Sequence, residues 1–291
     1  MVLDPARADR WNALMKHSLL RALLATALFS GPLAAAESVL LADPDVKLGL
    51  KIEASTVSKN GRTVTTGAGG SNTRSVDITR TRQLQRTMAP DATGGEVTYR
   101  ILKDHITTVV DGKKENTTAP LDGKVATGLR NGAGNWTFTL ADGTATGEAV
   151  EQLEILAGFE NRRWLPNRKV EVGESWNFAP NFIRASLKRD IPNPQVMGTM
   201  KLRQIGKAPD GTRQAIIDCF IRGGGQKELP QGGGAQADGG LTGNLTVNLD
   251  QPGRMRFHLV GKLATGAEDG SGTARAMMPL TLTLKTDPLG K

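Results

Sequence analysis

The stretch LTGNLTVNLDQPGRMRFHL, Leu241 to Leu259, carries the clearest structural pattern in the chain. Its apolar residues, such as Leu245 and Val247, alternate with polar ones up to the turn-forming Gln-Pro-Gly. The alternation then resumes through Met255 and Phe257. A period of two, interrupted by a turn, predicts an antiparallel hairpin with one apolar face and one wet face.

The same period recurs along the rest of the chain. The alternating segments are Leu48–Ala54, Val97–Ile101, Trp136–Leu140, 200–205, 214–221 and 280–284, and the turn signals between them are Asn60-Gly61, Asp111-Gly112, Asp122-Gly123 and Pro209-Asp210-Gly211. Pro279 marks a strand start or an edge strand. This pattern predicts a mainly β protein with curved antiparallel sheets, as a half-open barrel or as two β halves, and excludes a doubly wound α/β fold.

One segment has a helical period instead. In residues 148–159, Val150, Leu153 and Leu156 recur at helical spacing, while the glutamates line another face. We expect a single amphipathic helix that covers an open face of the sheet.

Three arginines interrupt the alternation. Arg80, Arg82 and Arg86 share the parity of the apolar residues Ile78 and Leu84. Two explanations are open: a bulge changes the exposed face midway, or the strand bends out of the core.

The N-terminal segment reads as a secretory signal peptide at residues 15–36. Lys16 and Arg21 precede a short apolar stretch, which ends in Ala34-Ala35-Ala36. We expect residues 1–14 to precede the true start, cleavage near Ala36, and a periplasmic or secreted product. The apolar stretch is too short for a permanent membrane span, so no transmembrane anchor is expected in the mature form.

The mature chain divides into three parts by pattern. Residues 37–145 form an N-terminal β half, 146–180 a helix and connector, and 181–291 a C-terminal β half. The last part contains a Gly-rich segment, 223–240, which composition predicts as a mobile loop.

Composition disfavours several functions. The net charge of +8 is scattered, without the basic runs that nucleic-acid binders carry, so no nucleic-acid partner is expected. Aromatic residues make up 4%, which disfavours a stacking platform for sugars. The single cysteine, Cys219, lies among apolar residues and is expected to be a buried, unreactive thiol.

No catalytic, cofactor or metal site is predicted. His105 follows Asp104, but neighbours on a strand point to opposite faces and cannot form a dyad. His258 belongs to a polar strand face with Arg256. Around Ser175 the second glycine of a nucleophile elbow is missing. The spacing of histidines and cysteines fits no zinc site.

The segment Trp164 to Trp176, WLPNRKVEVGESW, resembles an LP-x-x-x-V-x-V-G-[DE]-[ST]-W signature of exported bacterial β-rich proteins of unknown function. The resemblance implies that a helix precedes the segment and a second β half follows it, with no implied activity. Its residues are expected to be structural: Leu165, Pro166, Val170, Val172, Gly173, Ser175 and Trp176. Val170 and Val172 would begin a strand, Gly173 would allow a tight turn, and Trp176 would anchor the core.

Two functions remain open, with a hydrolase as a weaker third. The first is a non-enzymatic binding or carrier module for an apolar small molecule or lipid in the bacterial envelope. Its cavity would be lined by strand residues, or the same residues would fill a solid core: Leu48, Leu50, Ile52, Trp136, Phe138, Leu245, Val247 and Phe257. The second is a module that docks on an envelope protein without a cavity, through a basic strand face (Arg254, Arg256 and Lys262) or through the three arginines of residues 80–86.

Overall fold

A computed structural model describes residues 37–43, 49–89, 95–188, 193–228, 233–269 and 272–290. The predicted signal peptide, the segment before it and Leu48 lie outside the described residues. By its internal contacts the chain divides into Met1–Glu37 and Ser38–Lys291, and the fold below is that of the second unit.

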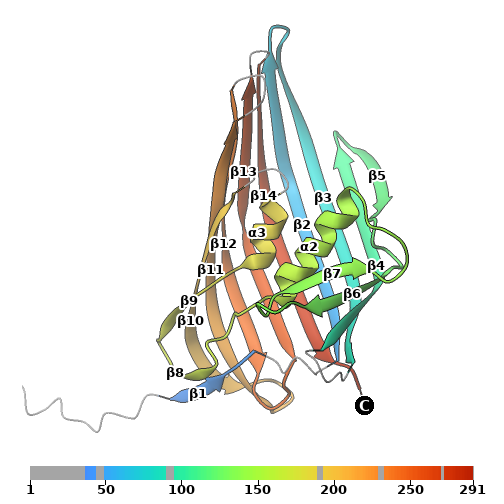
Figure 1. Cartoon of the computed structure of the whole chain (residues 1–291). Helices are drawn as coiled ribbons and strands as arrows, with labels where there is room; N and C mark the ends of the chain where they lie inside the picture. The colour runs from blue at the N-terminus through green and yellow to red at the C-terminus, as the bar shows by residue number, and fades with distance from the viewer. Residues whose placement is uncertain are drawn as a thin grey trace, which may run out of the picture. The chain divides into compact units, whose positions relative to one another are not determined.

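The second unit is built mainly from β-strands (Figure 1). The strands are β1 (Ser38–Leu41), β2 (Leu50–Gly67), β3 (Gly70–Ala89), β4 (Glu96–Val110), β5 (Lys113–Thr118), β6 (Val125–Arg130), β7 (Trp136–Leu140), β8 (Arg168–Glu171), β9 (Ser175–Phe178), β10 (Gln195–Lys207), β11 (Arg213–Glu228), β12 (Gly234–Asn248), β13 (Met255–Asp269) and β14 (Gly272–Pro288). The helices are α2 (Glu148–Glu160) and α3 (Asn181–Lys188).

Twelve strands form one antiparallel sheet, in the order β7-β6-β4-β3-β2-β14-β13-β12-β11-β10-β9, with β5 attached to β4. β1 and β8 form a separate pair. The sheet does not close, because β7 and β9 are its two edges. This confirms the predicted class of a mainly β, half-open antiparallel sheet under a helical cover. The N-terminal and C-terminal halves meet inside it, where β2 pairs with β14.

The hairpin predicted for Leu241–Leu259 is confirmed. β12 and β13 pair with Leu245 opposite Phe257 and Val247 opposite Met255, and all four side chains are buried. Their shared parity defines the inner face of the sheet, which the helices cover. The opposite parity, which includes His258 and Arg256, defines the outer face and is exposed.

The helix predicted at 148–159 is observed as α2. A second helix, α3, was not predicted, because its eight residues are too few to show a helical period. The two helices pack closely where Gly158 meets the backbone of Asn181 and Phe182. Both lie across the inner face of the central strands (Figure 1).

One turn prediction and one strand-end prediction were wrong. Asn60-Gly61 does not end a strand, because β2 continues through it to Gly67. Asn60 adopts φ 58° at a register shift and donates its backbone N–H to Asp77, so the pair forms a bulge. Pro279 is neither a strand start nor on an edge. It lies inside β14, where pairing with β2 is interrupted and no backbone donor is needed.

The Gly-rich segment 223–240 is mostly strand, which corrects the expected loop. Residues 223–228 end β11 and 234–240 begin β12, paired in continuous register. Sheet hydrogen bonds involve the backbone alone, and glycine allows close approach. A side chain at Gly224 would lie 2.5 Å from the Ala237 carbonyl oxygen.

Arg80, Arg82 and Arg86 lie on the inner face, so neither explanation offered from sequence applies. Arg82 is opposite Ala54 and Arg86 is opposite Leu50, whose side chain is buried. They face inward because carboxylates from other elements meet them there. Arg80 and Arg82 contact Asp104, and Arg86 contacts Glu160. These arginines therefore do not form the solvated docking face proposed from sequence.

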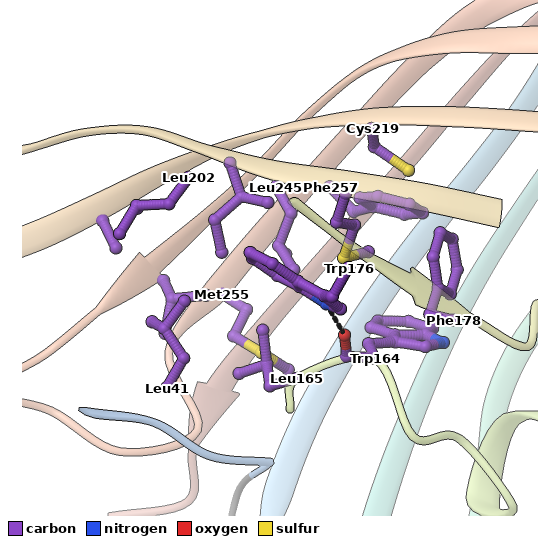
Figure 2. Close-up of a cluster of buried hydrophobic side chains, with 14 of the residues drawn as sticks. Leu41, Trp164, Leu165, Trp176, Phe178, Leu202, Cys219, Leu245, Met255 and Phe257 are labelled. Atoms are coloured by element: carbon purple, nitrogen blue, oxygen red, sulfur yellow. Dashed lines mark hydrogen bonds between the residues drawn. The ribbon is translucent and has the colours of Figure 1, made fainter. Parts of the chain in front are cut away.

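Two buried clusters form the core. One gathers side chains of β9–β13 around Trp164 and Trp176, and the other gathers β2, β3, β4, β6 and β7 against α2. Figure 2 shows the first cluster, in which the Trp176 indole N–H donates to the Trp164 carbonyl oxygen over 2.8 Å. Phe159 and Leu284 pack against both clusters. The space between the clusters, under the helices, contains the candidate site.

Candidate ligand cavity

A cavity of about 160 Å³ lies between the inner face of the sheet and the two helices. Its floor comes from four neighbouring strands: Ile52 and Ala54 of β2, Leu84 of β3, Phe257 of β13, and Leu282 and Leu284 of β14. Its roof comes from Ile155, Leu156 and Phe159 of α2 and from Phe182, Ile183 and Ser186 of α3. The wall is therefore mostly hydrocarbon.

Trp164 closes one side of the cavity. Its ring stacks on Phe257, with centroids 5.3 Å apart, and makes edge or tilted contacts with Phe159 and Phe182. The Trp164 indole N–H is buried and has no hydrogen-bond partner among the described residues. Buried indole donors are usually paired, so this wall residue carries an unused donor.

Arg82 is the one charged residue in the described lining of the cavity. Its Nε lies 3.3 Å from Oδ1 of Asp104, a carboxylate that is itself buried. Asp104 is engaged more closely by Arg80, whose Nε and Nη2 each lie 2.7 Å from one of its oxygens. Burial, and next the neighbouring Arg80, lower the pKa of Arg82 to about 10, so it remains a cation at neutral pH.

The eight residues predicted to line a cavity lie in different parts of the fold. Ile52 and Phe257 line the cavity under the helices. Leu50, Trp136, Leu245 and Val247 are buried in the two core clusters away from it. Phe138 is buried as well and borders a separate hollow beside α2. Leu48 lies outside the described residues.

The helical half of the cavity was missing from the sequence prediction. The residues of α2 were expected to pack on the sheet, and α3 was not expected at all. Pro180, immediately before the segment NFIRASLK, was the available signal, because proline favours the first turn of a helix.

The signature segment is structural in most of its parts. Leu165 and Val170 are buried, and Pro166 is half-buried. Gly173 adopts φ 94° in the turn between β8 and β9, which suits glycine. Ser175 is exposed at the start of β9, and Trp176 is buried. Val172 differs from the expectation, because β8 ends at Glu171 and Val172 is 38% exposed.

The side chains that could take part in catalysis lie apart from one another. His105 is exposed and Asp104 is buried, on opposite faces of β4. Cys219 is buried, and burial raises the pKa of its thiol to about 12. Within the described part of the chain, His, Cys, Asp and Glu side chains form no group of three that could hold a metal ion.

A second, larger hollow of about 1000 Å³ lies on the outer face, between β10 and β2. Its lining is mixed, with Arg62, Arg222 and Arg275 beside Met197 and Met277. This hollow is the more open of the two and is lined by charged as well as apolar side chains. The smaller cavity under the helices is therefore the better candidate for an apolar ligand.

Comparison with known proteins assigns this chain to no family. No protein-family model matches the sequence, and no curated protein matches it. Among solved structures, DynF from the dynemicin biosynthesis pathway of Micromonospora chersina is similar at 10% identity over 88% of each chain, with a TM-score of 0.22. So low a TM-score supports no inference about this chain. No helix in the described segments is long and apolar enough to cross a membrane.

Proposed function

We propose that this protein is a non-enzymatic binding or carrier module for an apolar ligand. The observation that carries the proposal is the cavity between the inner face of the sheet and the two helices. Apolar side chains from β2, β3, β13, β14, α2 and α3 converge on a space that they do not fill. Small-molecule sites in proteins are commonly concave, mostly apolar, and fitted with a few polar groups.

The volume limits what the cavity holds in this conformation. An engineered apolar cavity of about 150 Å³ stays dry and binds benzene. A space of about 160 Å³ therefore accommodates one ring or a short alkyl chain. A longer ligand would have to displace part of the helical roof or extend beyond it.

The location in the envelope is part of the proposal and derives from the N-terminal sequence. A signal peptide at residues 15–36 would deliver the rest of the chain outside the cytoplasm. A non-enzymatic role is supported by the buried Cys219 thiol and by the separation of His105 from Asp104.

The first test is native mass spectrometry of the protein purified without detergent, followed by solvent extraction of any bound molecule. We expect a stoichiometric apolar molecule, or binding of an added single-ring probe such as toluene. The variant Ala54→Leu places a larger side chain in the cavity and should abolish this binding. The matched variant Ala264→Leu makes the same change in the outer hollow and should leave binding intact.

Circular dichroism melting of both variants shows whether each retains the wild-type fold. Loss of binding in Ala264→Leu alone would place the ligand in the outer hollow. A wild-type protein that carries and binds no apolar molecule would refute the carrier proposal.

A second function, docking on an envelope protein, is favoured by a patch on the outer face. Phe220 and Val260 lie in one cross-strand row, separated only by Thr242, and both are more than 40% exposed. The next row carries Arg222 and Lys262. Such a surface suits a partner with apolar and acidic side chains. Binding that weakens with added salt, and that Phe220→Ser reduces while Ala54→Leu does not, would support docking.

A further inference from the structure

Arg82 gives the apolar cavity a polar end. It lies on the inner face of β3, in register with Ala54 of β2 and Asp104 of β4. Its side chain lines the cavity beside Ile52 and Leu84, although one fifth of that side chain reaches solvent. A ligand in the cavity would therefore meet hydrocarbon on most sides and a guanidinium at one boundary.

Only one nitrogen of the Arg82 guanidinium, Nε, donates a hydrogen bond to a described residue. Asp104 is held by both ends of the Arg80 fork, and Arg82 reaches it only through Nε. Neither Nη of Arg82 has a hydrogen-bond partner among the described residues. A guanidinium carries five N–H donors in a plane, and its terminal pair matches the two oxygens of a carboxylate.

The local charges leave a cation in excess at this boundary. Two arginines share one buried carboxylate. Beyond Asp104, Glu148 at the start of α2 also acts on Arg82, but only at longer range, and its carboxylate accepts a hydrogen bond from Gln152. Glu148 is exposed, so water screens its charge. An anion placed against Arg82 would neutralise its charge and accept hydrogen bonds from its Nη atoms.

We propose that the ligand is an anionic amphiphile of the carboxylate class, with its apolar part between the sheet and the helices and its carboxylate on the Nη atoms of Arg82. This inference rests on the proposed carrier function and narrows its ligand. The partial desolvation of Arg82, which lowers its pKa, is consistent with it, because a poorly hydrated cation gains more from an anionic partner.

Paired probes of equal chain length test the proposal. Octanoate and octan-1-ol differ only in the head group, and isothermal titration calorimetry measures the binding of each. We expect wild-type protein to bind octanoate at least about tenfold more tightly than the alcohol. This is the ratio of dissociation constants that one charge-assisted hydrogen bond produces. Arg82→Gln should remove this preference and retain binding of octan-1-ol.

Two further variants distinguish a specific contact with Arg82 from bulk electrostatic attraction. Arg82→Lys keeps the charge without the fork and should keep only part of the preference. Arg256→Gln removes an exposed cation of the outer face and should behave as wild type. If Arg82→Gln does not fold, Arg82→Lys and Arg256→Gln keep the test: a preference reduced in Arg82→Lys alone is expected, and the same preference in both variants and the wild type would overturn the proposal.

The outcomes separate the role of Arg82 from the carrier function. Equal binding of both probes by wild type, or an octanoate preference that survives in Arg82→Gln, would overturn the role of Arg82 and leave the carrier function standing. Binding of neither probe would overturn both. Equal loss of the preference in Arg256→Gln and Arg82→Gln would show bulk electrostatic attraction and overturn the specific contact.

Discussion

The carboxylate of Glu160, the last residue of α2, accepts a hydrogen bond from the Arg86 guanidinium of β3, 74 residues earlier in the chain. Both side chains are 2% exposed. Arg162 approaches the second carboxylate oxygen at 3.5 Å and is also buried. This contact fixes the end of the helical roof to the centre of the sheet.

Removing the carboxylate should strongly destabilise the protein. Glu160→Ala removes the buried carboxylate that the Arg86 and Arg162 guanidinium groups contact, and we expect a loss of about 3–5 kcal/mol in the free energy of unfolding. Urea denaturation measures the change. The control, Asp218→Ala, removes one partner of the exposed pair Arg203–Asp218 and should cost at most about 1 kcal/mol. Equal costs in the two variants would contradict the assigned role of the buried pair.

The indole hydrogen bond of Trp176 should also be measurable. Trp176→Phe keeps an aromatic ring but leaves the Trp164 carbonyl without this donor. We expect a loss of about 1–3 kcal/mol, from the unsatisfied group and the smaller ring. The neighbouring change Asn177→Ala, at an exposed position of β9, should stay within about 0.5 kcal/mol. A thermal melt of Trp176→Phe that matches the wild type would exclude the hydrogen bond as a stabilising contact.

An alanine scan of two glycines in β10 tests the packing at one edge of the sheet. A Cβ at Gly198 would lie 2.3 Å from the Phe178 ring of β9, whereas at Gly206 the nearest atom would be 3.8 Å away. Gly198→Ala should therefore destabilise by about 1–3 kcal/mol through overpacking. Gly206→Ala should be close to neutral by the same denaturation measurement, and a reversed order would contradict the placement of Phe178 over Gly198.

The Cys219 thiol should be unreactive while the protein is folded. Burial raises its pKa to about 12, so little thiolate exists near neutral pH, and the side chain is enclosed. With a chromogenic disulfide reagent we expect slow modification in buffer and rapid modification in concentrated guanidinium chloride. Rapid labelling of the native protein would show that this part of the core opens readily.

Acid should destabilise the protein in part through Asp250. Its pKa is lowered chiefly by the backbone N–H of Arg213, and next by the Arg213 guanidinium. The unfolded state therefore binds the proton more readily. The stabilisation is complete above the ordinary aspartate pKa of about 3.9 and is lost as pH falls through the lower folded value.

Melting temperatures of Asp250→Asn across this pH range should decline less steeply with acid than those of wild type. The control Asp142→Asn changes an exposed aspartate after β7 that has no hydrogen bond or ion pair among the described residues, and it should keep the wild-type decline. Identical declines in all three proteins would rule out a contribution from Asp250.

Local patterns predicted most of the sheet. The alternation around Leu245 and Phe257 gave the face, the pairing and the turn of one hairpin, because a half-buried antiparallel strand imposes that period directly. The spacing of Leu153 and Leu156 likewise located α2. The glycines of 223–240 were misread because composition reports flexibility, whereas neighbouring strands determined their conformation through backbone hydrogen bonds.

The candidate site was less predictable, since it depends on contacts between distant segments. Arg82 resembles a surface residue until Asp104 of the next strand and the two helices are placed around it. Ile52 and Phe257 could be assigned to the apolar face, but nothing in their own strands indicates that they border a space. Leu245 and Val247 have the same pattern and lie in solid core.

The pairing of β2 with β14 has a consequence for synthesis. Thr56 of β2 lies in register opposite Leu282 of β14, the last strand in chain order. During translation the earlier strands can form hairpins with their sequence neighbours, but the strand beside β2 has not yet been made. The cooperative fold is therefore reached only after residues 272–288 have emerged. Until then the backbone groups on one side of β2 stay unpaired in the nascent chain, which leaves that strand vulnerable to mispairing with another chain.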